Sequence, residues 1–177
     1  MELNERLAAL EDRVAALEGR RAVPELPEGT FWALEGLKQR AGEGAVLFTG
    51  PAPLPTGEYY EWQQGATLVD LQDMDWSESS TAFAALGHPV RLLLLKLILG
   101  GVRSTAELQE HEALGTTGQL YHHLRQLVAT GWLQVTGRGH YAVPGQKVVP
   151  LLVLLAAVLN PTVPNPTVLD PIVLDPG

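Results

Sequence analysis

The chain has 177 residues, of which 46% are hydrophobic and 18% charged, with a net charge of −8 and no cysteine. This composition indicates a folded protein and excludes a disordered chain, disulfides, thiolate metal sites and cysteine catalysis. The N-terminus is acidic and amphipathic, unlike a signal peptide, and the longest apolar run (148–159) is too short for a bilayer span, so we expect a cytoplasmic protein that does not contact a membrane.

Residues 1–21 are predicted to form an amphipathic dimerisation helix. Its apolar residues recur at alternating intervals of four and three, as in the core positions of a coiled coil. These residues are Leu3, Leu7, Leu10, Val14 and Leu17. Charged neighbours such as Glu11 and Glu18 favour a short parallel zipper, and packing of the helix on its own domain is the alternative. Residues 22–30, which contain proline and glycine, are expected to be a linker.

Residues 31–76 are predicted to form a small module of a helix and a β-hairpin. The helix, at 30–40, has Phe31, Leu34 and Leu37 on its inward side. The intervening sequence GPAPLPTG between the two strands is expected to be a stiff loop that cannot pair. The strands are predicted at 45–49 and 58–63, followed by a short helix at 67–74.

The hairpin carries three aromatic residues, Tyr59, Tyr60 and Trp62. Such a group is expected in a core rather than in a ligand cage. Two roles stay open for the module: a sensory or dimer-reinforcing element, or a structural collar around the domain that follows.

Residues 79–160 are predicted to form a helical domain with one hairpin. Pro89 suits the first position of a buried apolar helix, and the pairs Ser104/Glu107 and Thr116/Gln119 have the pattern of capping boxes. Predicted in chain order are helices at 80–86, 89–99 and 104–111, a turn at 112–115, a helix at 116–130, strands at 132–136 and 140–143, and a helix at 148–159.

The charge of this domain differs from that of the rest of the chain. Residues 79–160 carry six Lys and Arg against three Asp and Glu, a net of +3, whereas residues 1–78 carry six against 15, a net of −9. A basic segment inside an acidic chain favours a nucleic-acid partner, because the local field is what a phosphate backbone meets.

The helix at 116–130 divides into an apolar and a polar face. Its apolar stripe is formed by Leu120, Leu124, Leu127 and Val128. The opposite face holds Gly118, His122, Arg125, Gln126 and Ala129. Small residues that permit close approach, an amide, and His or Arg side chains are what a helix needs to read base edges in a major groove.

Three stretches, ALGHPVRLLLLKLIL, STAELQEHEALGTTGQLYHHLRQLVATGWL and GRGHY, resemble the winged helix-turn-helix regulators of the ArsR-like class. The resemblance covers residues 79–159. It implies that the helix opened by Thr116 is the recognition helix, that the glycine hairpin is the wing, and that the first and last helices form a dimer interface. The last helix would contribute Val148, Leu151, Leu152, Leu155 and Leu159.

The same resemblance implies a set of DNA contacts. The residues expected at base edges or nearby phosphates are Thr116, Thr117, Gln119, Tyr121 and His122, with Gln126 on the same face; those expected at the DNA backbone are Arg125, Arg138, His140, Arg103 and Ser104. Alternatives stay open for some of them. Thr116 and Gln119 can serve only as caps, while His123 is expected to be semi-buried packing and Arg91 to pair with an acid.

No enzyme, cofactor or metal site is predicted. Many members of the resembling family sense metals, but this chain has no cysteine, and its last helix has no ligand residue. The adjacent His122 and His123 point about 100° apart on a helix and cannot chelate together.

Residues 161–177 repeat Asn-Pro-Thr-Val and Val-Leu-Asp-Pro, and their prolines predict an extended tail. Either the apolar residues of the tail dock on a groove, in this subunit or in a partner, or the end is flexible.

The sequence therefore predicts a mainly α chain with small β elements (α+β), built around a winged helix-turn-helix. Its predicted function is that of a homodimeric regulator that binds a pseudo-palindromic site in double-stranded DNA. A dimeric scaffold that recruits proteins without binding DNA is the alternative, and an effector or protein partner of unknown identity is compatible with both.

Overall fold

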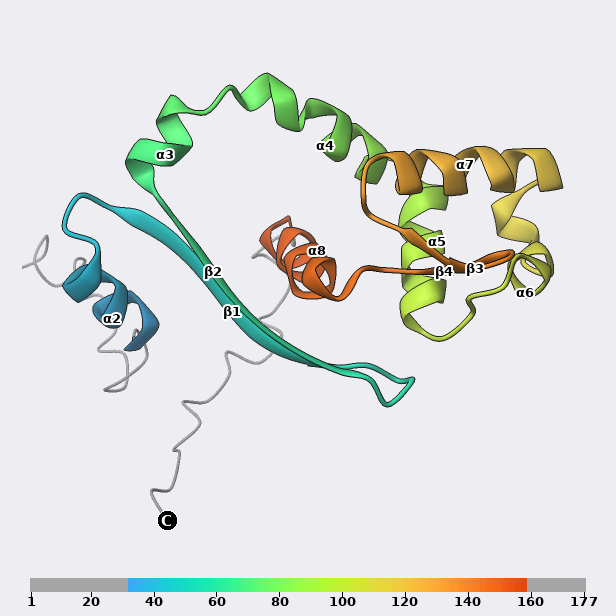
Figure 1. Cartoon of the computed structure of the whole chain (residues 1–177), viewed down its shortest axis with the longest axis horizontal. Helices are drawn as coiled ribbons and strands as arrows, with labels where there is room; N and C mark the ends of the chain where they lie inside the picture. The colour runs from blue at the N-terminus through green and yellow to red at the C-terminus, as the bar shows by residue number, and fades with distance from the viewer. Residues whose placement is uncertain (1–31, 159–177) are drawn as a thin grey trace, which may run out of the picture. The chain divides into compact units, whose positions relative to one another are not determined.

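The computed structural model describes residues 32–158 (Figure 1). The chain divides into two compact units, residues 1–36 with 166–177 and residues 37–165. The predicted coiled-coil helix, the linker and the proline-rich tail lie outside the described residues, as do Phe31 and Leu159. Among the described residues, helices combine with two separate two-stranded antiparallel sheets, which confirms the predicted α+β class.

Helix α2 (Trp32–Arg40) is the first described element. Its bounds agree with the predicted helix, but Leu34, which was predicted to face inward, is 45% exposed. That prediction is wrong, because this short helix buries none of its side chains.

Strands β1 (Ala45–Pro53) and β2 (Tyr59–Thr67) form an antiparallel ribbon. The prediction that the segment after Thr49 cannot pair is wrong, because β1 continues to Pro53. The N–H of Leu54 donates to the carbonyl of Glu58 at 2.8 Å. From that pair, hydrogen-bonded and non-hydrogen-bonded residue pairs alternate along the ribbon. Pro51 and Pro53 belong to non-hydrogen-bonded pairs, in which the backbone nitrogen points away from β2. A proline at such an edge position removes no bond from the ladder.

The two faces of the ribbon have different surroundings. Tyr60 and Trp62 pack against the hydrophobic core, as expected. Tyr59 is 58% exposed and donates its hydroxyl to Glu61 Oε1 at 2.9 Å. The expectation of core packing is therefore wrong for Tyr59, because successive side chains of a strand point to opposite faces.

Helix α8 (Gly145–Ala157) packs against both strands of the ribbon. The contact depends on glycine at one position, because a Cβ atom on Gly145 would lie 2.9 Å from Tyr60 Cε1. Gly50 also faces α8, but a Cβ atom there would lie 3.6 Å from Val149 Cγ1, an ordinary contact distance. This helix begins before the predicted Val148, and it joins the hairpin to the helical region within the unit 37–165.

Between the ribbon and the central helix the chain forms three short elements, α3 (Leu68–Asp73), η1 (Trp76–Ser79) and α4 (Ser80–Leu86). Gly87 is the C-cap of α4, as predicted. Helix α5 (Pro89–Leu99) follows with Pro89 at its first position, and the N-cap His88 accepts a hydrogen bond at Nδ1 from the N–H of Val90 at 3.2 Å.

Both predicted capping boxes are confirmed. Helix α6 (Thr105–Gln109) has its box at Ser104 and Glu107, and α7 (Thr117–Ala129) has its box at Thr116 and Gln119. The short helix η2 (Glu112–Leu114) occupies the turn between them, and Gly115 adopts a φ of 76°, a conformation that favours glycine. Figure 1 shows α7 crossing α5, and the two helices are in contact.

The second hairpin consists of β3 (Gln134–Gly137) and β4 (His140–Ala142). It is attached to the segment before α6. Tyr141 donates its N–H to the carbonyl of Arg103 at 3.0 Å, and Thr105 donates its N–H to the carbonyl of Gly139 at 2.9 Å. The orientation of the hairpin is therefore fixed relative to the start of α6.

The hydrophobic core lies where α5, α6, α7 and α8 meet. Its most deeply buried side chains are Leu94, Leu95, Ile98, Leu108, Leu114, Leu120, Leu124, Leu127, Leu133, Val148 and Leu151. The predicted apolar stripe of α7 is confirmed, with three of its leucines at or below 1% exposure and Val128 half-buried. Within residues 32–158, no single helix has the length and apolar composition to cross a membrane. The segments Trp76–Leu86 and Pro89–Leu99 reach that length and composition only when taken together, and the chain bends by 76° between them.

Substitution of Gly145 by alanine is expected to destabilise the fold, because the new methyl group would overlap the ring of Tyr60. Overpacking of this kind costs about 1–3 kcal/mol. The measurement is urea unfolding followed by circular dichroism. The control is Gly118→Ala in α7, where a Cβ atom meets nothing within 4 Å and the helix gains about 0.5–1 kcal/mol. Equal stability of the two variants would show that α8 does not need this close approach.

Candidate nucleic-acid interface

Helix α7 presents one accessible face that is mainly polar. Its inward leucines fix its rotation, so that the opposite side is open to solvent. The exposed residues along α7 and its N-cap are Thr116, Thr117, Gly118, Gln119, Tyr121, His122, Arg125, Gln126 and Ala129. The helix contains no acidic residue. It therefore offers a surface that a polyanion can approach without charge repulsion.

The start of this helix is rigidly defined. The amide oxygen of Gln119 accepts hydrogen bonds from the N–H of Thr116 at 2.8 Å and from its hydroxyl at 3.1 Å. A Cβ atom on Gly115 would lie 2.4 Å from that same oxygen. The alternative prediction, that Thr116 and Gln119 cap the helix, is confirmed. Their side-chain oxygens are used in the hydrogen bonds of the cap.

Further along the helix, Arg125 and His122 are exposed on adjacent turns. Arg125 donates from Nε to the carbonyl of Tyr121 at 3.2 Å, which holds the side chain against the preceding turn of the helix, and the residue is exposed. Tyr121 is 37% exposed, at the border of the polar face. Beyond the cap, the exposed side chains of α7 that can form hydrogen bonds are Thr117, Tyr121, His122, Arg125 and Gln126.

The β3–β4 hairpin adds a second cation. Arg138 lies in its turn and is exposed, and its backbone carbonyl accepts a hydrogen bond from His140 Nδ1 at 3.0 Å. Because the hairpin is bonded to the segment before α6, Arg138 is carried by an anchored turn rather than a free loop.

Arg103 and Ser104, which were predicted to contact the DNA backbone, have partners within the chain. The guanidinium of Arg103 forms an ion pair with Glu58, 45 residues earlier at the end of the first hairpin. Hydrogen bonds from Arg103 and then Thr56 hold the pKa of Glu58 below its usual value. The charge of Arg103 is therefore already paired with a carboxylate, and its contact with the DNA backbone stays a prediction. The Ser104 hydroxyl is engaged with Glu107 in the capping box of α6.

The prediction that Arg91 pairs with an acidic residue is wrong. Arg91 donates from its guanidinium to the backbone carbonyls of Ala84, at 2.7 Å, and Ala85. These are carbonyls of the last turn of α4, which have no partner within the helix. Arg91 is a C-terminal cap that ties α4 to α5.

His123 is semi-buried packing, as expected. Its ring centroid lies 4.6 Å from that of His88, and its Nδ1 is buried without a hydrogen-bond partner among the described residues. Burial, followed by the nearby charges of His88, Arg91 and His122, lowers the pKa of His123. The folded protein therefore holds this imidazole in its neutral form.

Two residues assigned to the dimer interface have another role. Val148 and Leu151 are buried in the core of their own chain, at 0% and 1% exposure, so they present no surface to a partner. Leu152 and Leu155 are 40% and 39% exposed and line an apolar groove of about 500 Å³ between the first hairpin, α5 and α8. Of the predicted dimer residues that the structure describes, only Leu152 and Leu155 are placed for contact with another molecule.

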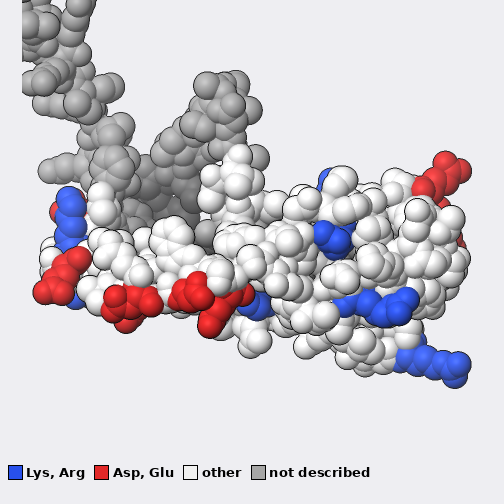
Figure 2. Space-filling model, turned by 90° about the horizontal axis from the view of Figure 1, so that it is seen from above, with Lys and Arg blue, Asp and Glu red and all other residues white. Residues whose placement is uncertain are grey.

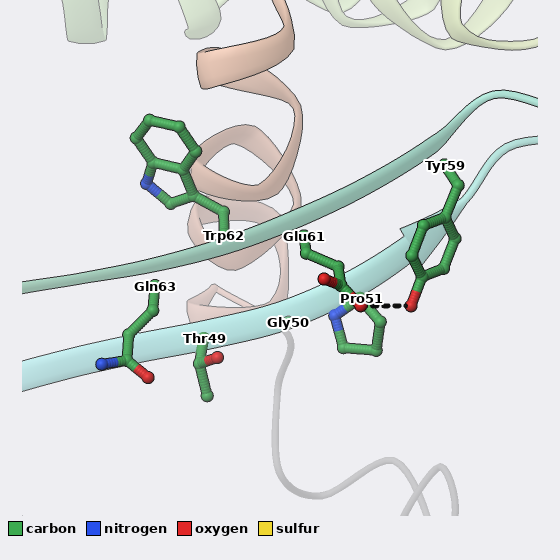
Figure 3. A pocket seen from close by; sticks show the side chains of 7 residues that line it. All are labelled: Thr49, Gly50, Pro51, Tyr59, Glu61, Trp62 and Gln63. Atoms are coloured by element: carbon green, nitrogen blue, oxygen red, sulfur yellow. Dashed lines mark hydrogen bonds between the residues drawn. The ribbon is translucent and has the colours of Figure 1, made fainter.

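A shallow hollow of about 410 Å³ lies on the first hairpin (Figure 3). Its charged group is Glu61, whose carboxylate accepts the Tyr59 hydroxyl and, through this bond first, raises the pKa of that phenol. The lining contains no cation, so the hollow offers no positive charge that would bind a polyanion. Across residues 32–158, no three His, Asp or Glu side chains are grouped to hold a metal ion.

The Glu58–Arg103 pair is the contact of this region that sequence reasoning missed. Glu58 follows a turn and has no motif around it, so no local signal marks it.

Comparisons of the chain with protein-family models, with curated proteins and with solved structures find no match.

The neutral His123 leads to a prediction about pH. A group whose pKa is lowered by folding stabilises the protein at pH values above its pKa in the unfolded chain, which is near 6.5 for histidine. This stabilisation is lost as the pH falls through the pKa of the folded state. We expect the free energy of unfolding to decline from pH 7 to pH 5, and to decline less in His123→Gln. The measurement is urea unfolding across that range. His111→Gln is the control, expected to follow the wild type, and parallel profiles for His123→Gln and wild type would contradict the prediction.

Proposed function

We propose that the chain is a homodimeric transcription regulator of the winged helix-turn-helix type, which binds double-stranded DNA with α7 and the β3–β4 hairpin. One observation carries the proposal: α7 buries its leucine stripe and exposes a face without a single acidic residue, and the anchored hairpin that follows it in the chain bears the exposed Arg138. The order helix, helix, turn, helix, hairpin is that of the resembling regulators, in which α7 would be the recognition helix and the hairpin the wing.

The side chains on this face have the chemistry of a base reader. Gln126 can donate to and accept from adenine, His122 and Arg125 can meet guanine or phosphate, and Gly118 allows close approach of the helix. Arg138 in the wing would contact the DNA backbone, which fixes orientation but carries no sequence information. Because the Gln119 oxygen is used in the cap, we place sequence reading at His122 and Gln126 rather than at Gln119.

The surrounding charges restrict how DNA can approach. The segment from α3 to η1 carries Asp70, Asp73, Asp75 and Glu78 and no basic residue. In Figure 2 acidic side chains lie along one stretch of the visible face, and basic side chains lie mainly toward the other end, where an acidic group also stands at the corner. A duplex laid across α7 would be repelled from α3 and η1, which favours one orientation on the protein.

The test is fluorescence anisotropy of the purified full chain with a pool of labelled genomic DNA fragments at 50 and 200 mM salt. We expect a subset of fragments to bind more tightly than the nonspecific level of about 10⁻⁴–10⁻⁶ M. Arg125→Ala and Arg138→Ala should each weaken binding to all fragments and reduce the salt dependence by about one counterion. His122→Ala should reduce the preference among fragments, by about 1–3 kcal/mol for a lost base contact.

Arg40→Ala is the matched control for these substitutions, because Arg40 is an exposed cation at the end of α2, outside α7, the β3–β4 hairpin and the apolar groove. If the control lost as much affinity as Arg125→Ala, binding would depend on net charge and not on the proposed face. Uniform weak binding of every fragment, unchanged by His122→Ala, would contradict sequence-specific recognition.

The apolar groove supports dimer formation and also a second candidate function. Leu152 and Leu155 expose apolar surface on the helix that, in the resembling regulators, joins the two subunits. Dimer symmetry would set two α7 helices about one turn of DNA apart, roughly 34–36 Å. The same groove favours the alternative of a protein-recruiting scaffold, since exposed apolar patches mark protein contacts.

Leu155→Glu is expected to shift the protein from dimer to monomer, because it places a charge in the apolar contact. The measurement is sedimentation equilibrium, with Gln146→Glu as a control that adds the same charge at an exposed site of α8 outside the groove. Loss of DNA affinity together with the dimer supports the regulator. A dimer that persists in Leu155→Glu would exclude this surface as the interface.

A further inference from the structure

A pocket of about 490 Å³ lies between the first hairpin and α8. Phe48, Trp62 and Gln64 line it from the ribbon, and Trp132 lines it from the segment after α7. The α8 side is formed by Gln146, Lys147, Pro150, Val153 and Leu154. Its size is within the range of small-molecule sites, about 300–1,000 Å³, and it combines apolar walls with a few polar groups, as such sites do.

Two tryptophans form walls whose orientation is fixed. The indole N–H of Trp132 donates to the carbonyl of Ala82 at 3.1 Å, and the indole N–H of Trp62 donates to Gln64 Oε1 at 3.2 Å. Figure 3 shows Trp62 leaving the ribbon on the side opposite to Thr49 and Gln63. Since both indole N–H groups already have acceptors, the rings offer apolar surface to a ligand rather than hydrogen bonds.

The pocket also holds a positive charge. Lys147 Nζ lies 5.2 Å from the centroid of the Trp132 ring, a cation–π contact. No acidic side chain of residues 32–158 pairs with this ammonium group. A lysine at the edge of an aromatic pocket, without a carboxylate partner in the described region, is suited to an anionic ligand.

We propose that this pocket binds a small planar aromatic carboxylate. The ring system of the ligand would contact Phe48, Trp62 and Trp132, and its carboxylate would pair with Lys147. Gln64 and Gln146, both exposed at the rim, supply amide groups for further polar substituents. An aromatic ring presents a flat surface for stacking or edge contacts with indole, and a carboxylate matches the charge of the ammonium group.

The position of the site would connect it to DNA binding. Trp132 and Leu133 both donate their backbone N–H to the carbonyl of Leu127, at 2.9 and 3.1 Å, and so are attached to the last turn of α7. The other wall belongs to α8, which carries Leu152 and Leu155. A bound ligand would therefore contact segments continuous with both the proposed recognition helix and the proposed dimer surface; this regulatory consequence rests on the proposed function, whereas the binding site does not.

The test is isothermal titration calorimetry of the full chain, without DNA, using 2-naphthoate and its uncharged analogue 2-naphthamide. We expect saturable binding of naphthoate and at least about tenfold weaker binding of the amide, the contribution of one charge-assisted hydrogen bond. Lys147→Gln should abolish that difference and Lys147→Arg should retain it. Lys96→Gln, which removes a lysine outside the pocket, should bind naphthoate like the wild type.

Val153→Phe provides a variant that leaves the charge in place. It fills part of the pocket and should weaken both ligands equally, and circular dichroism verifies that each variant is folded. Equal affinities for naphthoate and naphthamide, binding unchanged in Lys147→Gln, or no heat with naphthoate up to millimolar concentration would each overturn the proposal. Because no DNA is present, failure of the DNA-binding experiment leaves this result unaffected, and repeating the anisotropy with naphthoate tests the coupling separately.

Discussion

The arrangement of residues 37–158 depends on burial of one side of α8. Val148, Val149 and Leu151 insert into the core beside α5, while the start of the helix lies against the first hairpin at Gly50 and Gly145. Burying three aliphatic side chains provides on the order of 1.5–3 kcal/mol each. Without this contact the ribbon would be an isolated two-stranded sheet, which is marginal in water.

The same helix brings separate chemical groups together. Its Lys147 lies against Trp132 from the end of α7, and both line one pocket with side chains of the ribbon. The Glu58–Arg103 ion pair joins the turn end of the ribbon to the segment before α6. The first hairpin is thus attached to the helical region at two places, along its strands by α8 and at its turn by Arg103, which a separate appended module would not be.

Local signals in the sequence predicted much of the helical region. Pro89, the capping boxes at Ser104 and Thr116, and the leucine stripe of α7 each determine structure within a few residues, so they could be identified without knowing the fold. The Glu58–Arg103 pair could not, because no pattern links residues 45 positions apart. Nor could the burial of Val148 and Leu151, since an apolar helix has the same composition whether it faces its own core or a second subunit.

The prolines of β1 have a consequence for association between chains. Pro51 and Pro53 fall at the positions whose backbone nitrogens face away from β2, and a proline nitrogen carries no hydrogen to donate. A third strand approaching that edge would find acceptors without the alternating donors that a ladder requires. The residues that were expected to prevent pairing in this segment instead permit one partner strand and block the next, which protects the edge against the stacking that leads to aggregation.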